Sequence, residues 1–252
     1  MLMILAVLAA PASEDRHVDA VEIFSYNFGP EWDVNYDLWP DQWRREIGPG
    51  KPHYVEVQLA DDHEAVEGRC LKVALNGGGA LLTSPTVGVT DKFSYVVDAR
   101  LKTENLNGSR AQLRIDFCDD SPERKVLQSY KSDWYGNTGK WVNLRIGPVS
   151  ITEPGVRLAQ ITLVVQEGVE VDLTGVVSLD DIWFARLPRM TVRTNSPFNV
   201  YTDPKHVMVT CDLSGILETD PDIRFVVLCA SSARLDDDTV QRGARLVIER
   251  LS

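Results

Sequence analysis

The chain has 252 residues, enough for one large domain and a smaller second unit, and its 44% hydrophobic content is that of an ordinary globular protein. Its 26 Lys and Arg stand against 37 Asp and Glu, which gives a net charge of −11. This acidic balance excludes a nucleic-acid partner, which would need clustered cations to neutralise phosphates. No apolar run reaches the ~18–20 residues that a bilayer span requires, so no membrane span is predicted.

The chain begins with an apolar segment, Met1–Ala12, which is followed by charged residues from Glu14 onward. Ala10-Pro11-Ala12 is a small-x-small cleavage candidate, so residues 1–12 are predicted to be a signal peptide. The protein is then expected to be secreted, periplasmic or at the cell surface. No Lys or Arg precedes the apolar run, and the alternatives are an apolar first strand or a misplaced start codon.

After this leader, short runs of Val, Ile, Leu, Phe and Tyr alternate with turn residues, and helical periodicity is nearly absent. This pattern is typical of an all-β sandwich or barrel. The predicted strands of the main domain, residues 20–189, are Val21–Phe28, Tyr54–Ala60, Arg69–Leu75, Ala80–Ser84, Lys92–Lys102, Arg110–Cys118, Lys125–Lys131, Lys140–Ile146, Ala159–Gln166 and Val176–Leu187.

Two of these strands show clear alternation. The odd-numbered positions are apolar from Phe93 to Leu101 and again from Ala111 to Phe117, which indicates one core face on each strand. The turn Asn105-Leu106-Asn107-Gly108 contains an Asn-Gly pair suited to a hairpin. If the strands pair, four charged residues meet on the non-core face: Asp98, Arg100, Arg114 and Asp116. That face either binds a polar ligand or is a solvated surface joined by ion pairs.

Aromatic residues gather in two segments. Phe24–Trp43 mixes aromatic rings with carboxylates and prolines, and Asp133–Asn137 forms a second, shorter cluster. Flat aromatic rings can stack on the apolar faces of sugars, whose hydroxyls need polar partners. The alternative for the first segment is that its rings close the open edge of the sandwich. Trp141 lies on a predicted strand and is expected in the core.

A boundary is predicted after Pro188, because Met190–Pro204 is rich in turn residues. Three further strands are predicted beyond it: His206–Leu213, Ile223–Ala230 and Arg245–Leu251. Residues 190–252 are interpreted as a small, incomplete immunoglobulin-like β unit, short for an independent core. It either packs on the main domain or is the remaining part of a longer chain.

The four cysteines, Cys70, Cys118, Cys211 and Cys229, have no C-x-x-C spacing, so neither a zinc site nor a redox motif is indicated. They are predicted to be buried free thiols. For an exported protein, a disulfide between Cys70 and Cys118 or between Cys211 and Cys229 is the alternative.

The motifs of catalysis are missing from the sequence. It contains neither G-x-S-x-G nor H-E-x-x-H, and its four histidines have no ligand spacing. The run Gly77-Gly78-Gly79 leads into a strand and lacks the Lys of a phosphate loop. Paired aspartates lie in predicted turns, where Asp bonds to its own backbone. A non-catalytic protein is therefore predicted.

Two sequence segments indicate a family resemblance: TGKWVNL at Thr138–Leu144 and SLDDIWF at Ser178–Phe184. With these, residues 20–189 resemble the galactose-binding-like jelly rolls found as carbohydrate-binding modules in secreted bacterial glycoside hydrolases. The resemblance implies a jelly-roll β-sandwich, a polysaccharide ligand and a larger catalytic partner. It also implies a structural calcium ion, with Glu22, Asn27, Asp180 and Asp181 as ligands. The alternative for the Asp pair is a turn.

The sequence therefore predicts a carbohydrate-binding or ancillary module of a secreted polysaccharide-processing system. The predicted ligand-binding residues are Trp134, Tyr135, Trp39 and Tyr36 for stacking and Arg100 and Asp116 for polar contacts. The alternatives are a spacer or protein-interaction β-sandwich without a small ligand, and a glycoside hydrolase or lyase that uses the concave sheet face.

Overall fold

A computed structural model describes residues 16, 20–106, 108–167, 174–195, 208–215, 223–231 and 242–250. The predicted leader, residues 1–12, and Asn107 of the predicted hairpin turn lie outside these residues. The chain divides into two compact units, Met1–Ser214 and Gly215–Ser252.

Strands dominate the described residues, and most lie where the sequence predicts them. The exceptions are β2 and β6, a short polar strand and a two-residue strand that give almost no alternating pattern. The elements are β1 (Val21–Tyr26), the 3-10 helix η1 (Pro30–Trp32), β2 (Arg44–Glu46), β3 (Glu56–Asp61), β4 (Arg69–Asn76), β5 (Ala80–Thr83), β6 (Val87–Gly88), β7 (Phe93–Glu104), β8 (Ala111–Cys118), β9 (Val126–Lys131), β10 (Val142–Ser150), β11 (Leu158–Val165), β12 (Thr174–Thr194), β13 (Val209–Ser214), β14 (Ile223–Ser231) and β15 (Arg242–Arg250).

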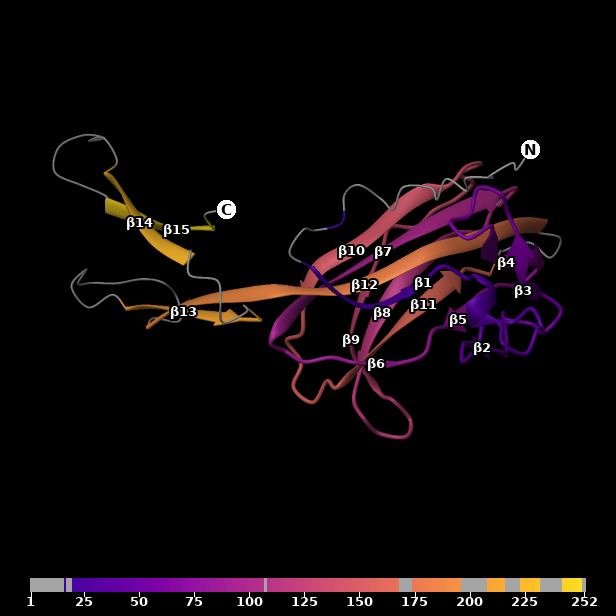
Figure 1. The fold of residues 1–252 in the computed structure, drawn as a ribbon, viewed down its shortest axis with the longest axis horizontal. Coiled ribbons are helices and arrows are strands. Elements are labelled where there is room, and N and C mark those ends of the chain that lie inside the picture. Colours follow the sequence, from indigo (N-terminus) through magenta and orange to yellow (C-terminus); the bar gives the residue numbers. More distant parts are fainter. Residues whose placement is uncertain are drawn as a thin grey trace, which may run out of the picture. The chain divides into compact units, whose positions relative to one another are not determined.

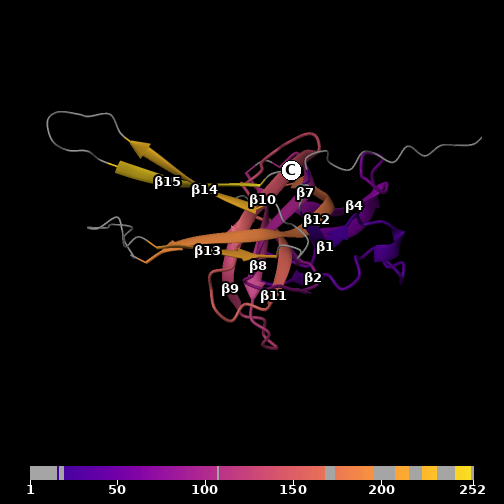
Figure 2. The ribbon, with the colours of Figure 1, turned by 60° about the vertical axis from the view of Figure 1, so that its left-hand side comes forward.

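The strands of the first unit form two antiparallel sheets. Sheet A has the order β10-β7-β12-β4-β3, and β1 and β13 also pair with β12. Sheet B has the order β2-β5-β11-β8-β9, and β6 also pairs with β11. Figures 1 and 2 show β10, β7 and β12 side by side in one layer. The main domain is thus the predicted jelly-roll β-sandwich.

One predicted pairing is wrong: β7 and β8 do not form a hairpin. β7 pairs with β10 and β12 in sheet A, whereas β8 pairs with β11 and β9 in sheet B. Their apolar faces instead meet across the core, where the rings of Tyr95 and Phe117 are 5.7 Å apart. Leu106, in the connection, is 4% exposed, because the chain crosses between the sheets there. Asp98 and Asp116 therefore lie on outer faces of different sheets.

The aromatic segment before β2 closes the sandwich edge, as its structural interpretation predicts. Tyr26 stacks on Trp32 with ring centroids 4.0 Å apart, and Trp43 is buried in the same core. Trp39 packs against this core, and its indole N–H donates to the Trp43 carbonyl at 3.1 Å. Tyr36 is the exception, because 84% of it is exposed.

β12 changes partners at a bulge. Residues up to Leu179 pair with β4, and those from Ile182 pair with β1. The register against β7 shifts between Asp180 and Trp183, and Asp181 has a φ of 47°. Such a bulge re-aims side chains, and it buries the Asp180 carboxyl completely.

The predicted boundary after Pro188 falls within β12, which runs on to Thr194 and pairs with β13. In the second unit, β14 and β15 form a two-stranded antiparallel sheet. These strands do not confirm an immunoglobulin-like unit.

The cysteines are only partly described. Cys70 and Cys118 are buried free thiols, as predicted, so the Cys70–Cys118 disulfide is not formed. The two residues lie on different sheets, Cys70 on β4 and Cys118 on β8. The side chains of Cys211 and Cys229 lie outside the described part of the structure.

Candidate functional site

A row of polar side chains crosses the outer face of sheet B. The strand register places Arg44 opposite Thr83, Thr83 opposite Thr162, Thr162 opposite Arg114, and Arg114 opposite Lys131. Their neighbours along each strand point into the core, so alternation directs this row outward. The hydroxyls of Thr83 and Thr162 are 3.3 Å apart and buried. The row thus offers cationic donors on both sides of a hydroxyl pair.

A pocket of about 400 Å³ lies over this row. Its size falls within the ~300–1,000 Å³ of ordinary ligand sites. The side chains that line it come from β2, β5, β8, β11 and the start of β9 with the loop before it: Arg44, Arg45, Glu46, Leu81, Thr83, Arg114, Glu123, Arg124, Val126 and Gln160.

Asp116 supports this face from beneath. It is 1% exposed, and its carboxylate accepts hydrogen bonds from the Arg114 Nε at 2.8 Å, from the Ser129 hydroxyl and from the Thr162 hydroxyl at 3.4 Å. Asp116 is thus covered and engaged, and it fixes the direction of the Arg114 guanidinium. Asp116 was predicted to contact the ligand, but it affects this surface by positioning Arg114.

Trp134 lies at the β9 edge of the same sheet. Tyr135 pairs with Ala111 at the start of β8, and its ring packs against the core. Because successive side chains of an extended segment point to opposite faces, Trp134 points outward. It is 42% exposed. Of the two aromatic residues predicted here, Trp134 is available for stacking and Tyr135 is half-buried.

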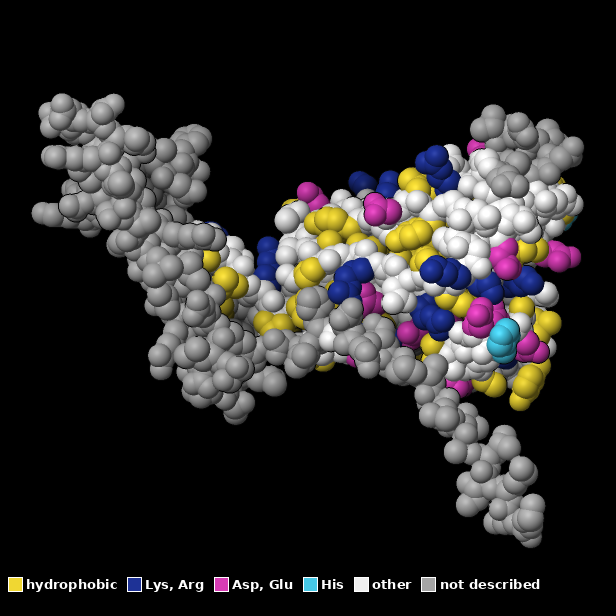
Figure 3. Space-filling view, turned by 90° about the horizontal axis from the view of Figure 1, so that it is seen from above, with side chains coloured by type: hydrophobic (Ala, Val, Ile, Leu, Met, Phe, Trp, Pro, Cys, Tyr) yellow, Lys and Arg dark blue, Asp and Glu magenta, His cyan; other side chains and the backbone are white. Residues whose placement is uncertain are grey.

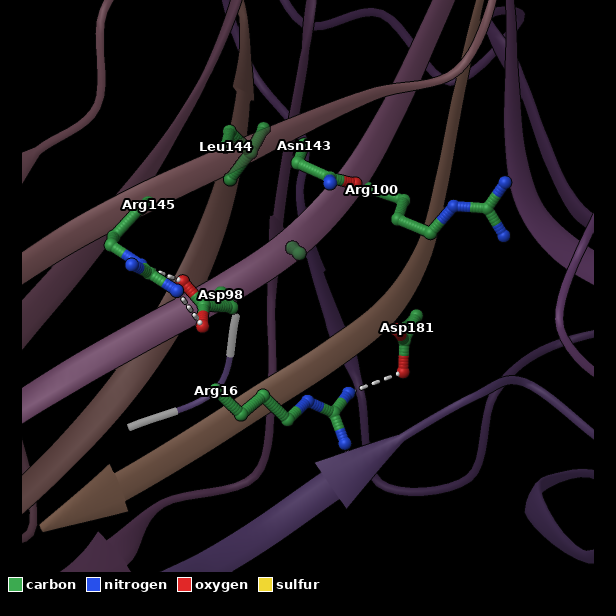
Figure 4. A pocket seen from close by; sticks show the side chains of 8 residues that line it. Arg16, Asp98, Arg100, Asn143, Leu144, Arg145 and Asp181 are labelled. Atoms are coloured by element: carbon green, nitrogen blue, oxygen red, sulfur yellow. Dashed lines mark hydrogen bonds and ion pairs between the residues drawn. The ribbon is translucent and has the colours of Figure 1, made fainter. Parts of the chain in front are cut away.

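A second pocket, of about 220 Å³, lies on the outer face of sheet A (Figure 4). At one end the Arg145 guanidinium binds Asp98 through two hydrogen bonds, of 2.6 and 2.9 Å. Arg16 reaches across the pocket to Asp181 at 2.9 Å. Arg100, predicted as a ligand contact, lies here and forms an ion pair with Asp180.

Trp141 is not a core residue, contrary to the prediction. It precedes β10, is half-buried, and lies beneath the Arg100 guanidinium, whose carbon is 5.0 Å from the ring centroid. Its position at the entry to an edge strand of sheet A, next to a cation, explains the difference. The indole N–H is buried without a hydrogen-bond partner.

The predicted ligand-binding residues are therefore not gathered at one place. Trp134 and Asp116 belong to sheet B, Arg100 belongs to sheet A, and Tyr36 and Trp39 lie in the segment between β1 and β2. Figure 3 shows basic and acidic side chains interleaved over one face of the molecule. The distribution of charge therefore does not identify a site on that face, and the ion pairs of the individual residues have to be considered.

The predicted calcium ligands are Glu22, Asn27, Asp180 and Asp181. Glu22 accepts the Ser25 hydroxyl at 2.9 Å, and Asn27 Oδ1 accepts the Trp32 indole N–H at 2.9 Å. Asp180 Oδ1 is buried without a partner. Among the described residues, no group of three His, Cys, Asp or Glu is placed to hold a metal. The four residues thus do not fit one ligand set, and calcium stays a prediction.

The arginines at the edge of sheet B were not predicted from the sequence. Arg44 and Arg45 lie on the short strand β2, and Arg124 lies in the loop before β9. The adjacent Arg44 and Arg45 are a weak signal, because nothing local indicates that Gln160 and Arg124 come next to them. Strand order alone brings these residues together.

No protein-family model matches the sequence, and no curated protein sequence matches it. Among solved structures, it is similar to the enzymatically active domain of tailspike protein 4 of bacteriophage CBA120, with 14% identity and a TM-score of 0.46 over 58% of this chain and 20% of that chain. It is also similar to the CBM22-1 xylan-binding domain of Paenibacillus barcinonensis Xyn10C, with 15% identity and a TM-score of 0.41 over 67% and 96%. It is similar as well to a cyclase from Fischerella sp. TAU, with 17% identity and a TM-score of 0.45 over 66% of this chain and 97% of that chain. Similarity at this level assigns neither family nor activity.

The class that the fold defines is a jelly-roll β-sandwich with a polar pocket on the outer face of each sheet. No helix within the described ranges is long and apolar enough to cross a membrane.

Proposed function

We propose that the chain is a carbohydrate-binding module that holds a polysaccharide on the outer face of sheet B. One observation carries this proposal: the exposed Trp134 stands at the edge of a sheet face whose centre is a pocket lined by hydrogen-bonding side chains. Sugar rings need both features, because their C–H faces stack on an aromatic plane while their hydroxyls require donors and acceptors.

The spacing on the sheet suits an extended ligand. Because Tyr135 pairs antiparallel with Ala111, Trp134 lies beside Gln112, and Arg114 lies two residues further along β8. At about 3.3 Å per residue, this separation along the strand is about 7 Å. A chain of at least two sugar units would therefore be needed to contact both the indole ring and the pocket.

Export, which the apolar leader supports, would place such a module among polysaccharides, and a catalytic partner would act on the bound chain. The alternative of a hydrolase lacks a supporting observation, because Asp116, the carboxylate at the centre of this face, is covered. The alternative of a spacer makes a different prediction for Trp134, which the experiment below tests.

Affinity gel electrophoresis of the full chain in gels that contain soluble polysaccharides tests the proposal. The wild-type chain should be retarded by at least one polysaccharide, and Trp134→Ala should weaken this binding about tenfold because a stacking partner is lost. Trp141→Ala is the matched control, because that indole lies beside sheet A. Thermal melting should be unchanged in Trp134→Ala. Retardation by no polysaccharide, or equal retardation of wild type and Trp134→Ala, would overturn the proposal.

A further inference from the structure

The pocket on sheet B has arginines without acidic partners. Arg44 donates to the neutral amide oxygen of Gln160 at 3.1 Å. Arg45 donates to the carbonyl of Pro52 at 2.6 Å, and its Nε is buried without a partner. Within the described chain, neither a hydrogen bond nor an ion pair engages the Arg124 guanidinium.

The acidic residues in this pocket do not balance these cations. Its lining holds four arginines against two glutamates. One of the glutamates, Glu46, is already bound by Lys51 outside the pocket, and Asp116 neutralises only Arg114. The pocket therefore keeps a local excess of positive charge.

This excess stands out in a chain whose net charge is −11. The pocket on sheet A is the internal comparison, because each arginine that lines it is ion-paired with an aspartate. Figure 4 shows Arg16–Asp181 and Arg145–Asp98, and Arg100 pairs with Asp180. The same residue type is thus charge-balanced on one sheet and left unbalanced on the other. Unbalanced guanidinium groups around a pocket favour a planar anion such as a carboxylate, or a sulfate, which accept their forked hydrogen bonds.

We propose that the ligand of the sheet B pocket is an acidic polysaccharide, whose carboxylate or sulfate groups are held by Arg44 and Arg124. The inference rests on the proposed carbohydrate-binding function and names its substrate class. The sugar ring stacks on Trp134 or fills the pocket over Thr83, while the anionic substituent takes the place of the missing acidic partners. The same arginines disfavour a cationic ligand.

The test compares one polymer in two charge states. Polygalacturonate and its fully methyl-esterified form share a backbone and differ in whether the carboxylate is charged or capped as a methyl ester, and dextran sulfate and neutral dextran form the sulfate arm. The full chain should bind an acidic form at least about tenfold more tightly than its neutral counterpart. This preference should shrink when NaCl is raised from about 0.1 M to about 1 M, which shortens the Debye length from about 10 Å to about 3 Å.

Variants then assign the effect to the pocket. Arg44→Gln and Arg124→Gln should each lower the affinity for the acidic polymer about tenfold, because each removes one charge-assisted hydrogen bond. They should leave the affinity for a neutral polymer within about twofold. The control Arg193→Gln removes an exposed arginine on β12, which belongs to the other sheet. Melting temperatures of the variants report whether the fold is intact.

The outcomes separate the two proposals. Binding of acidic and neutral polymers with equal affinity would overturn the inference and leave carbohydrate binding in place. Binding of neither would overturn both. Equally tight binding of single-stranded DNA would show an unspecific polyanion surface and would also overturn the inference. Equal losses in Arg193→Gln and Arg44→Gln would contradict the assignment to this pocket.

Discussion

The buried carboxyl of Asp180 makes the stability of the sandwich depend on pH. It lies at the bulge of β12 and is fully buried, with Oδ2 accepting the Val66 N–H at 2.8 Å and Oδ1 left without a partner. Arg100 approaches to 3.5 Å, longer than a hydrogen bond, and compensates only part of the charge. Ionised Asp180 is therefore costly in the native state.

The size of this cost follows from the pKa. Burial, the largest cause, raises the pKa of Asp180 from 3.8 to about 6, against the opposing effects of the Val66 and Asp181 N–H groups and of Arg100. Because the folded pKa lies above the unfolded one, the native state binds the proton more tightly. The stabilisation by the protonated carboxyl is complete below about pH 4 and is lost as the pH rises through about 6. A shift of about two units corresponds to about 3 kcal/mol.

Asp180→Asn removes this titration while it keeps an oxygen for the Val66 N–H. Between pH 4 and pH 8, the free energy of unfolding of the wild type should fall by about 2.5 kcal/mol more than that of Asp180→Asn. Urea titrations at one-unit pH intervals measure this difference. Val177→Ala, a buried neighbour on β12, is the control, and its curve should be lowered yet parallel to the wild type. Parallel curves for Asp180→Asn and wild type would refute the reasoning.

Two further predictions concern packing. Phe117→Ala should lower the free energy of unfolding by about 3–5 kcal/mol in urea, because the ring is fully buried and contacts Tyr95 across the core; a loss below about 1 kcal/mol would contradict this packing. Gly79→Ala should cost about 1–3 kcal/mol, because its Cβ would lie 2.4 Å from the Val165 carbonyl oxygen, whereas Gly88→Ala has open space and should cost far less. Equal melting temperatures for the two glycine variants would show that the backbone near Gly79 yields easily.

The strands of the main domain and the inward faces of β7 and β8 follow from the sequence, because alternation is a local property. Each apolar residue from Tyr95 to Leu101 at odd positions is buried, as predicted. The pairing of these two strands was predicted wrongly, because an Asn-Gly turn indicates where a chain reverses and not which sheet the next strand joins. β2 is too short and polar for a pattern to show it.

The candidate site was less accessible to sequence analysis. Trp134 was identified correctly as an exposed aromatic residue, because it lies in a turn-rich segment. Asp116 was identified by its alternation, yet its burial depends on Arg114 and Ser129 from two strands. Arg44 and Arg124 were not identified at all, since their shared pocket depends on the order of five strands.

The sequence by itself determined that this is an all-β chain with strands near the observed positions and with two segments of concentrated aromatic residues. The tertiary structure alone decided which strands share a sheet, which arginines have acidic partners, and that Asp180 is buried at a bulge. The physical reason is that side-chain alternation acts between neighbours in the chain. Charge compensation and burial depend instead on residues such as Arg44 and Gln160, which lie far apart in sequence and meet only through sheet order.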